Sequence, residues 1–395
     1  MFQNAYIPYK GYWSSPFARW QGTLQHVNSI VLGAATAKKA LATRGIDAAA
    51  LDGCVMGWSV AQKSVFYGTP WFTGMMGNDQ ISGPNFSQAC ATSASGAGYA
   101  GALVETGVYS AMLVAMVDRC SNGPHLVYPN PLGPGGKPDM EDWVMDNFAK
   151  DPYAKNAMIE TAEKVAKEAG ITREECDELT LDRYEKYAQA LADDRAFQKG
   201  YMISCDVKIG KKEIEFAEDE GVFPTTAEGM AKLRPVIPEG VLTFASQTHP
   251  ADGNIGLIVC SKDKADELSA DKNVTVQLLS YGYTRAEKGC MAKAPVPAAR
   301  MALESAGVKI EDLAAVKTHN PFAVNDVNME KEMKIPRKIF NNYGSSLIYG
   351  HPQAPTGGRL IVELIEELAN LGGGYGLFSG CAAGDTAASV VVKVG

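Results

Sequence analysis

Long apolar runs are missing from this chain, although 46% of its residues are hydrophobic. No run approaches the roughly 20 residues that a membrane-spanning helix needs. The first residues, Met1 to Tyr6, also lack the basic region and apolar core that mark a secretory signal. We therefore expect a cytoplasmic protein without a membrane partner.

Closely paired cysteines are missing too. None of the eight cysteines forms a Cys-x-x-Cys pair or a spacing typical of metal ligands. This pattern predicts neither a disulfide framework nor a metal site, and it suits a reducing compartment. The eight positions are Cys54, Cys90, Cys120, Cys176, Cys205, Cys260, Cys290 and Cys381.

A strongly basic stretch is the third absence. The formal net charge is -8, and no cluster of Lys and Arg offsets it. A nucleic-acid-binding surface would need such a cluster, so we expect no nucleic-acid partner. Acidity does not exclude a small anionic ligand, because one local pocket is enough to hold it.

Helical and strand-like segments alternate along the chain, which predicts an α/β protein. The apolar run 110–117 suits a strand covered on both faces, as in a mostly parallel sheet. Both halves show a strand, a helix and a returning strand around a reactive-looking residue, so we expect an internal duplication. Helices are expected over about 27–42, 297–306 and 360–371, the last amphipathic, and strands over 53–58, 274–279, 314–319, 376–378 and 388–394.

The character of the sequence changes between about residues 118 and 240. Residues 124–138 are rich in Gly and Pro and predict an irregular loop. Charged helical segments follow, one of them with Thr172 as N-cap and Glu175 three residues on. We interpret this region as an insertion over the active site; a solvated surface subdomain explains the same pattern.

One cysteine stands directly before a run of small residues. Residues 91–102 are mostly alanine, glycine and serine, which predicts a buried helix that neighbouring backbone can approach closely. Cys90 would lie at the N-terminal end of that helix, where the partial positive charge favours the nucleophilic thiolate. From this stretch alone, a small core cysteine is an equally good interpretation.

The second half adds two histidines and a further cysteine. His319 and His351 are two of only five histidines in the chain, and both are expected at strand-to-helix junctions. Cys381 lies in a Gly-rich turn that ends at Gly384. A single histidine is more often a hydrogen-bonded structural residue. Two histidines together with two cysteines in such turns favour a catalytic site.

These motifs, in this order, resemble the thiolase superfamily, and the likeness covers nearly the whole chain. The resemblance implies the thiolase fold, a duplicated, five-layered αβαβα arrangement with an inserted loop domain. It implies an N-terminal half over 1–118, the inserted loop domain over 119–240 and a C-terminal half over 241–395. It rests on Ser15-Pro16-Phe17-Ala18-Arg19, the stretch around Cys90, Asp219 to Pro235, Gly350-His351-Pro352 and Gly380-Cys381.

The resemblance also implies a division of catalytic work. Cys90 matches the nucleophile that takes the acyl group as a thioester, and His351 matches the base that activates it. Cys381 matches the acid or base that moves the substrate α-proton. His319, in His-Asn-Pro-Phe, is similar to the His-x-x-Phe branch of sterol-carrier-type and archaeal thiolases, and would donate to the thioester oxygen in an oxyanion hole.

The same resemblance implies contacts with the substrate. Thr248, Phe322 and Gly384 are the candidates for binding the acyl-CoA substrate and CoA, with Thr248 in place of the serine of a turn that normally reads Asn-Ala-Ser-Gly. His249 and Pro250 depart from that turn, which favours an unusual acyl group. Coenzyme A is implied as a cosubstrate, with no permanently bound cofactor, and Lys or Arg of the insertion would meet its phosphates.

Large apolar residues precede the nucleophile, and their ordinary interpretation is core or subunit contact. The sharper interpretation is a pocket for a bulky aromatic acyl group, as in thiolases of anaerobic aromatic degradation. That would make the substrate 2-benzoylsuccinyl-CoA, giving benzoyl-CoA and succinyl-CoA, with a small zinc-ribbon OB-fold partner subunit. The residues are Trp58, Phe66, Tyr67, Trp71, Phe72, Met75 and Met76.

Other functions stay open. One is an acetyl-CoA C-acetyltransferase acting on short or medium 3-oxoacyl-CoA. Another is a condensing synthase of the ketosynthase or hydroxymethylglutaryl-CoA synthase type, which lacks the second cysteine of this turn, so Cys381 favours a thiolase. A non-catalytic subunit is the third, and retention of both cysteines and both histidines argues against it. The family likeness further implies a homodimer or homotetramer.

Overall fold

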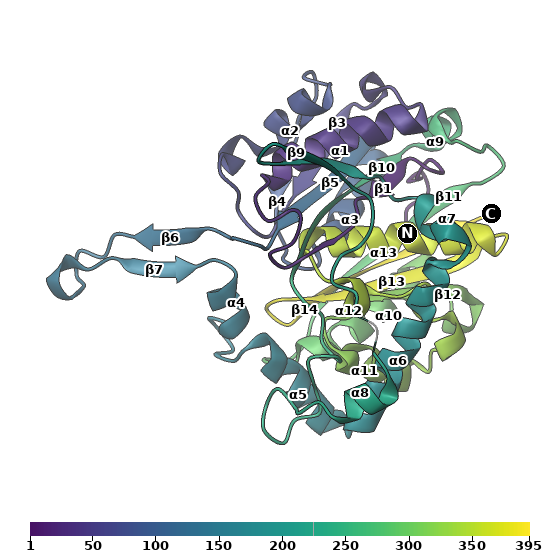
Figure 1. Cartoon of the computed structure of the whole chain (residues 1–395). Coiled ribbons are helices and arrows are strands. Elements are labelled where there is room, and N and C mark those ends of the chain that lie inside the picture. The colour runs from purple at the N-terminus through teal and green to yellow at the C-terminus, as the bar shows by residue number, and fades with distance from the viewer. Residues whose placement is uncertain (224) are drawn as a thin grey trace.

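The computed structural model describes residues 1–223 and 225–395, which fold around two large β-sheets (Figure 1). The first sheet has the strand order β1-β10-β5-β3-β4, with β2 also paired to β10. Its strands are β1 (Tyr12–Ser14), β2 (Ala18–Arg19), β3 (Gly53–Gly57), β4 (Asn85–Phe86), β5 (Ala111–Arg119) and β10 (Ala251–Cys260).

Strand β5 lies inside this sheet and is buried along its length up to Arg119. The prediction of a strand covered on both faces is therefore confirmed. The expectation of a mostly parallel sheet is wrong, because β5 is parallel to β3 but antiparallel to β10, and β1 and β2 are also antiparallel to β10. An apolar run reports burial on both faces, and it carries no information on strand direction.

Strand β10 was not predicted, because its first residues suggested a loop. Asp252, Gly253 and Asn254 are turn-forming residue types, but in the sheet the Ser121 N–H donates to Asp252 at 2.9 Å and the Asn254 N–H donates to Ser15 Oγ at 2.9 Å. Since β10 pairs with β1 and β5, we propose that the second half begins after Cys260 rather than at residue 241.

The second sheet has the order β11-β14-β13-β12, and it repeats the pairing of the first. In each sheet the first three strands of the shared order are antiparallel neighbours, and the last pair, β5 with β3 or β13 with β12, is parallel. This repetition confirms the expected duplication. The strands are β11 (Val276–Arg285), β12 (Leu313–His319), β13 (Gly374–Ala382) and β14 (Thr386–Val394).

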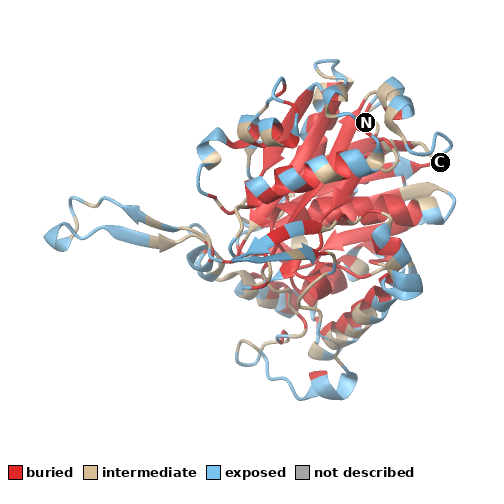
Figure 2. Cartoon of the chain, turned by 45° about the horizontal axis from the view of Figure 1, so that its top comes forward, coloured by how far each residue is buried: buried red, intermediate tan, exposed pale blue. Residues whose placement is uncertain are grey.

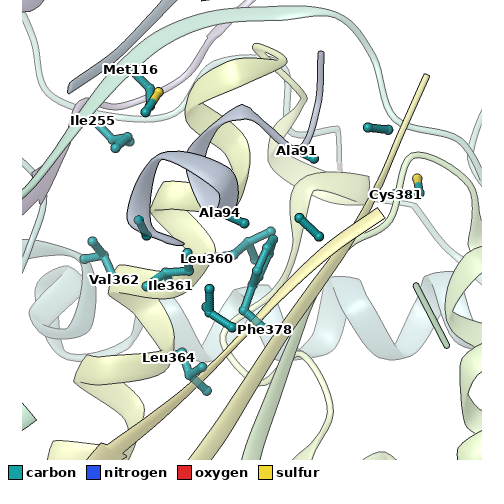
Figure 3. Packing of buried hydrophobic residues seen from close by; sticks show 14 of the residues in the cluster. Ala91, Ala94, Met116, Ile255, Leu360, Ile361, Val362, Leu364, Phe378 and Cys381 are labelled. Atoms are coloured by element: carbon teal, nitrogen blue, oxygen red, sulfur yellow. The ribbon is translucent and has the colours of Figure 1, made fainter. Parts of the chain in front are cut away.

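Two helices form the layer between the sheets. Helices α3 (Thr92–Glu105) and α13 (Ala354–Asn370) pack on each other and on strands of both sheets. Figure 3 shows Ala94 of α3 close to Leu360 of α13, above Phe378 of the second sheet. The small residues of α3 permit this approach. The helix predicted over 360–371 is confirmed as part of α13, but every residue from Ala354 to Leu368 is buried, so its charged side chains face protein partners rather than solvent.

The outer layers complete five-layered αβαβα packing, as the sequence predicted. Helices α1 and α2 cover the first sheet, and α10 covers the second, with α11 beside α10. Figure 2 shows both sheets and the central helices buried. The bounds are α1 (Ser29–Arg44), α2 (Gly68–Met76), α9 (Lys262–Leu268), α10 (Pro295–Ala306), α11 (Ala323–Met333) and α12 (Ser346–Tyr349).

The region 119–240 contains most of the remaining elements. The prediction of an irregular loop over 124–138 is wrong in part. Strands β6 and β7 form an exposed hairpin that projects from the body (Figures 1 and 2). The predicted capping box is confirmed: the Glu175 N–H donates to Thr172 Oγ1 at 3.2 Å. The elements are β6 (His125–Tyr128), β7 (Asp139–Asp142), α4 (Met145–Ala149), α5 (Met158–Ala169), α6 (Arg173–Ala190), α7 (Ala192–Lys199), β8 (Cys205–Ile209), β9 (Lys212–Phe216) and α8 (Ala227–Ala231).

Within the described residues, no helix is both long enough and apolar enough to cross a membrane. The eight cysteines are all free thiols.

Candidate active site

Cys90 lies in a tight turn between β4 and α3, two residues before the helix begins. Its neighbour Ala89 has a positive φ of 45°, a strained conformation for a residue with a side chain. The Gln88 N–H donates to Thr92 Oγ1 at 2.9 Å and helps to hold the turn. Cys90 as a residue is partly buried, and it lines a cavity.

His351 lies three residues before α13 begins, and its side chain contacts the Cys90 thiol. Its Nε2 lies 3.1 Å from Cys90 Sγ, and its Nδ1 lies 2.6 Å from Thr356 Oγ1. The His351 N–H donates to the His249 carbonyl at 2.9 Å, which fixes the backbone. One ring nitrogen is thus held by a hydroxyl while the other faces the sulfur, the geometry needed for proton exchange with the thiol.

His319 stands at the end of β12, with its ring stacked on that of His351 at 4.0 Å between centroids. Its Nδ1 lies 3.1 Å from Ser346 Oγ. Its Nε2 is buried and has no hydrogen-bond partner among the described residues. A bound carbonyl oxygen next to Cys90 would supply that missing partner.

Cys381 lies at the end of β13 and is fully buried. Asn325 Nδ2 donates to its sulfur at 3.3 Å. Cys381 precedes Ala383 by two residues, Ala383 lines the same cavity as Cys90, and Cys90 helps to raise the pKa of Cys381. The structure therefore brings all four predicted catalytic residues to one place, although they come from four separate segments.

The thiol faces a cavity of about 650 Å³. Thr248 and Phe322 line it, as expected of binding residues, and the Thr248 hydroxyl also donates to the Ser346 carbonyl. Gly384 is not among the described lining residues; its neighbour Ala383 is, while the Gly384 carbonyl accepts from Arg285 Nε at 3.1 Å.

Most of the aromatic wall of this cavity comes from the inserted region, which the sequence predicted to lie over the active site without singling out its aromatic residues. Tyr128, Trp143 and Phe148, from the β6–β7 hairpin and α4, line it together with Phe322. None of the seven large apolar residues expected as an aromatic pocket is among its described lining residues. Phe72 and Met76 are core residues, and Phe66 and Tyr67 are 89% and 66% exposed.

Sequence reasoning also missed three polar side chains around the site: Gln353, Asn325 and Thr356. The Cys90 thiol donates to Gln353 Oε1 at 3.0 Å, and Gln353 has a positive φ of 59° directly before α13. Its place two residues after His351 was the available signal. Asn325 and Thr356 lie within helices, where nothing in the local sequence marks them.

The charge states of the site are set mainly by burial. Burial raises the pKa of the Cys90 thiol to about 12, and burial together with the nearby His319 lowers the pKa of His351 well below its usual value. Burial also lowers the pKa of His319 to about 3. The expectation of a thiolate at the helix end is therefore wrong, because loss of solvation outweighs the helix dipole.

This charge state predicts how Cys90 reacts with pH. Below its pKa the thiolate fraction rises about tenfold per pH unit, so alkylation by iodoacetamide should accelerate continuously between about pH 7 and pH 10. Mass spectrometry of wild type, with Cys90→Ser to subtract other cysteines, measures the rate. A rate already constant at neutral pH would show a stable thiolate–imidazolium pair and contradict the predicted neutral thiol.

A metal site was not predicted, but one group of three ligand-type residues meets here. One ligand atom from each of Cys90, His319 and His351 lies within 4.8 Å of the others. The two imidazole rings are stacked with an angle of 29° between their planes, so their lone pairs run side by side rather than toward one point. This arrangement suits a substrate oxygen better than a shared metal ion, and we assign no metal to it.

The chain is similar to known proteins both in sequence and in three-dimensional structure. An acetyl-CoA acetyltransferase of Syntrophomonas wolfei is 27% identical over 397 residues, covering 96% of each chain. A 3-ketoacyl-CoA thiolase of Escherichia coli is 32% identical over 257 residues, covering 60% of this chain and 58% of that one.

Solved structures show the same fold at lower identity. The Bacillus anthracis acetyl-CoA acetyltransferase superposes with a TM-score of 0.91 at 24% identity, covering 100% of this chain and 99% of that one. Human mitochondrial 3-ketoacyl-CoA thiolase in complex with CoA gives 0.89 at 23% identity, covering 100% and 98%. The models of the thiolase N-terminal and C-terminal domains match residues 13–263 and 272–394, nearly the whole of the chain. The chain belongs to the thiolase family.

Proposed function

We propose that this acyltransferase catalyses CoA-dependent thiolytic cleavage of a 3-oxoacyl-CoA, or the reverse Claisen condensation, through an acyl group on Cys90. The observation that carries the proposal is the 3.1 Å approach of His351 Nε2 to Cys90 Sγ at the wall of a cavity of about 650 Å³. Cys381 and His319 complete the group. Relatives named as acetyl-CoA acetyltransferase and 3-ketoacyl-CoA thiolase support it.

In the cleavage direction, His351 Nε2 takes the proton of the Cys90 thiol as the sulfur attacks the 3-oxo carbon. The C2–C3 bond then breaks, leaving the shortened acyl group as a thioester on Cys90 and the electron pair on the acetyl-CoA enolate. Cys381 protonates that enolate at carbon. The proton on His351 then returns to the Cys381 thiolate, and acetyl-CoA leaves. CoA next attacks the acyl-Cys90 thioester, with the neutral His351 accepting its thiol proton. The acyl–Cys90 bond breaks, His351 returns that proton to the Cys90 sulfur, and the acyl-CoA product leaves.

Donors at the carbonyl oxygen would stabilise the negative charge in these steps. His319 Nε2, which has no partner among the described residues, is oriented to donate to that oxygen when Nδ1 accepts from Ser346. The lowered pKa of His319 keeps it neutral, so it donates without becoming a competing acid. The backbone of Ala383 instead acts on the Cys90 sulfur, where it lowers the pKa of the thiol against the effect of burial.

The cavity also indicates which part of the substrate it holds. No Lys or Arg is among its described lining residues, so it suits the neutral pantetheine and acyl portions rather than the phosphates of CoA. The name of the acetyl-CoA acetyltransferase relative favours a short acyl group. The four aromatic side chains that line the cavity favour a bulkier acyl group. The benzoyl group, from 2-benzoylsuccinyl-CoA, is therefore our second candidate.

Intact-protein mass spectrometry tests the reaction and identifies the acyl group. Wild type and Cys90→Ser are incubated with acetyl-CoA, acetoacetyl-CoA, longer 3-oxoacyl-CoA thioesters and 2-benzoylsuccinyl-CoA. We expect prompt mass gain in wild type alone, with the added mass naming the acyl group. No adduct with any of these substrates would contradict the proposed function, and an adduct without a benzoyl mass would remove the aromatic candidate.

The condensing-synthase alternative predicts a different use of the second thiol. In that class no cysteine acts at the position of Cys381, whereas here its sulfur lies at the site with a hydrogen-bond donor at 3.3 Å. This observation favours the thiolase reaction. Homodimer or homotetramer formation, a zinc-ribbon OB-fold partner and a cytoplasmic location stay predictions.

A further inference from the structure

The second thiol of the site has one side-chain donor directed at its sulfur. Asn325, in the first turn of α11, donates from Nδ2 to Cys381 Sγ at 3.3 Å. Both side chains are buried, with Asn325 2% exposed and Cys381 fully enclosed. Contact with this sulfur is the only side-chain hydrogen bond recorded for the Asn325 amide among the described residues.

The other half of the same amide makes no such bond. Asn325 Oδ1 is buried and has no partner among the described residues. A buried carbonyl oxygen without a donor costs about 1–3 kcal/mol, so this amide is a poor choice for stability alone. Unsatisfied buried groups of this kind call for a functional explanation.

An amide suits a thiol that alternates between two protonation states. Its N–H group donates to the thiolate, and its carbonyl oxygen accepts from the thiol after a rotation about the last side-chain bond. Burial raises the pKa of Cys381 well above its usual range, and Cys90 and Asp326 raise it further. Arg183 pairs with Asp326 at 3.0 Å. Asn325 and the backbone at Cys381 oppose these effects.

We propose that Asn325 is a positioning residue that orients the Cys381 sulfur and stabilises its thiolate during proton transfer at the substrate α-carbon. In condensation, the sulfur takes a proton from that carbon: the S–H bond forms, the C–H bond breaks, and the electron pair passes to the enolate. Cleavage reverses the step. This inference rests on the proposed function of the same site.

Deuterium exchange separates this proton step from acyl transfer. With acetyl-CoA in D₂O, Asn325→Leu should incorporate deuterium into the acetyl group about 10- to 100-fold more slowly than wild type, the effect of losing one hydrogen bond to a charged sulfur. Its exchange rate should also reach its plateau at higher pH. Acetylation of Cys90, followed by mass, should change less than about threefold.

Stability is the readout that separates a structural role from the proposed one. Because Leu removes the orphaned oxygen, the urea midpoint of Asn325→Leu should be unchanged or higher, whereas a structural amide predicts a lower one. If Asn325→Leu folds poorly, Asn325→Asp takes its place. It keeps the shape of the side chain but adds a negative charge beside the sulfur, so it should slow deuterium exchange more than Asn325→Leu does. Asn328→Leu, on the same buried helix, is the matched control and should retain wild-type exchange.

A second measurement needs no turnover. In a Cys90→Ser background, the ultraviolet absorbance of the Cys381 thiolate, taken as the difference from the same protein with Cys381→Ala, should rise at higher pH in Asn325→Leu. An unshifted curve, or equal losses of exchange in Asn325→Leu and Asn328→Leu, would overturn the role of Asn325. Failure of the proposed function would give a different result. Wild type would then neither become acetylated on Cys90 nor exchange deuterium into acetyl-CoA, while the pH shift of Cys381 in Asn325→Leu would persist.

Discussion

Replacing His351 by Asn is expected to slow acylation of Cys90 by about 10²- to 10⁴-fold, the usual contribution of a positioned general base. The pKa of Cys90 is raised to about 12, so the thiol depends on an acceptor for its proton. His351 Nε2, at 3.1 Å, is that acceptor. Stopped-flow mixing with acyl-CoA, followed by acid quench and intact mass, gives the rate.

Thr356→Val is the matched control for this experiment. It leaves the imidazole in place and removes the hydroxyl that lies 2.6 Å from Nδ1, so it should cost less than the loss of His351 itself. Raising the pH should partly restore acylation in His351→Asn, because hydroxide then forms the thiolate directly. Acylation by His351→Asn at a rate within about threefold of wild type would exclude His351 as the base.

The position of the site follows from the duplication. Cys90 precedes α3 and His351 precedes α13, the two helices that occupy equivalent places between the sheets. Cys381 ends β13, whose counterpart in the first sheet is β5. Corresponding elements of the two halves therefore end close to one another. The reactive side chains of both halves meet at the N-terminal ends of the two central helices.

Much of this arrangement could be predicted from the sequence. Family-like motifs in a fixed order predicted that Cys90, His319, His351 and Cys381 would converge, and the structure places them together. Their chemical roles remain predictions. The five-layered fold was predicted by resemblance and is confirmed by the sheet order and by structural neighbours at a TM-score of 0.91.

Other features depend on contacts that local sequence does not encode. The polar start of β10 suggested a loop until its partners in β1 and β5 were known. Charged residues on α13 suggested a solvent-facing side, but Glu363 and Glu366 are buried and paired. The partners of Glu366 include Lys10 and Tyr12, more than 350 residues away in the chain.

The protonation state of Cys90 could not be predicted from the sequence, because it depends on how far the sulfur is buried. A cysteine at a helix N-terminus suggested a thiolate, and the turn does place Cys90 two residues before α3. The amount of water at the sulfur depends on the packing of distant segments, including His351 and Gln353. Since desolvation is the largest influence on this thiol, the sign of its pKa shift follows from the three-dimensional packing.

A buried ion cluster links the inserted region to the central helix. Arg359 of α13 pairs with Asp219 at 2.7 Å and with Glu363 at 2.9 Å, and all three side chains are fully or almost fully buried. The Phe17 N–H donates to Asp219 at 2.8 Å, and the Arg359 guanidinium lies 3.7 Å from the ring centre of Tyr349. The cluster thus fixes the start of the 219–235 segment beside the helix that begins near His351.

Replacing Arg359 by Met is expected to reduce the free energy of unfolding by about 3–5 kcal/mol, because it leaves two carboxylates buried without their counter-charge. Urea denaturation measures this loss. Lys262→Met breaks the exposed pair with Asp266 and should cost less than about 1 kcal/mol. Equal losses in the two variants would contradict the argument from burial. Partial recovery of stability by Asp219→Asn in the Arg359→Met background would show that the uncompensated charge, rather than lost packing, is the cause.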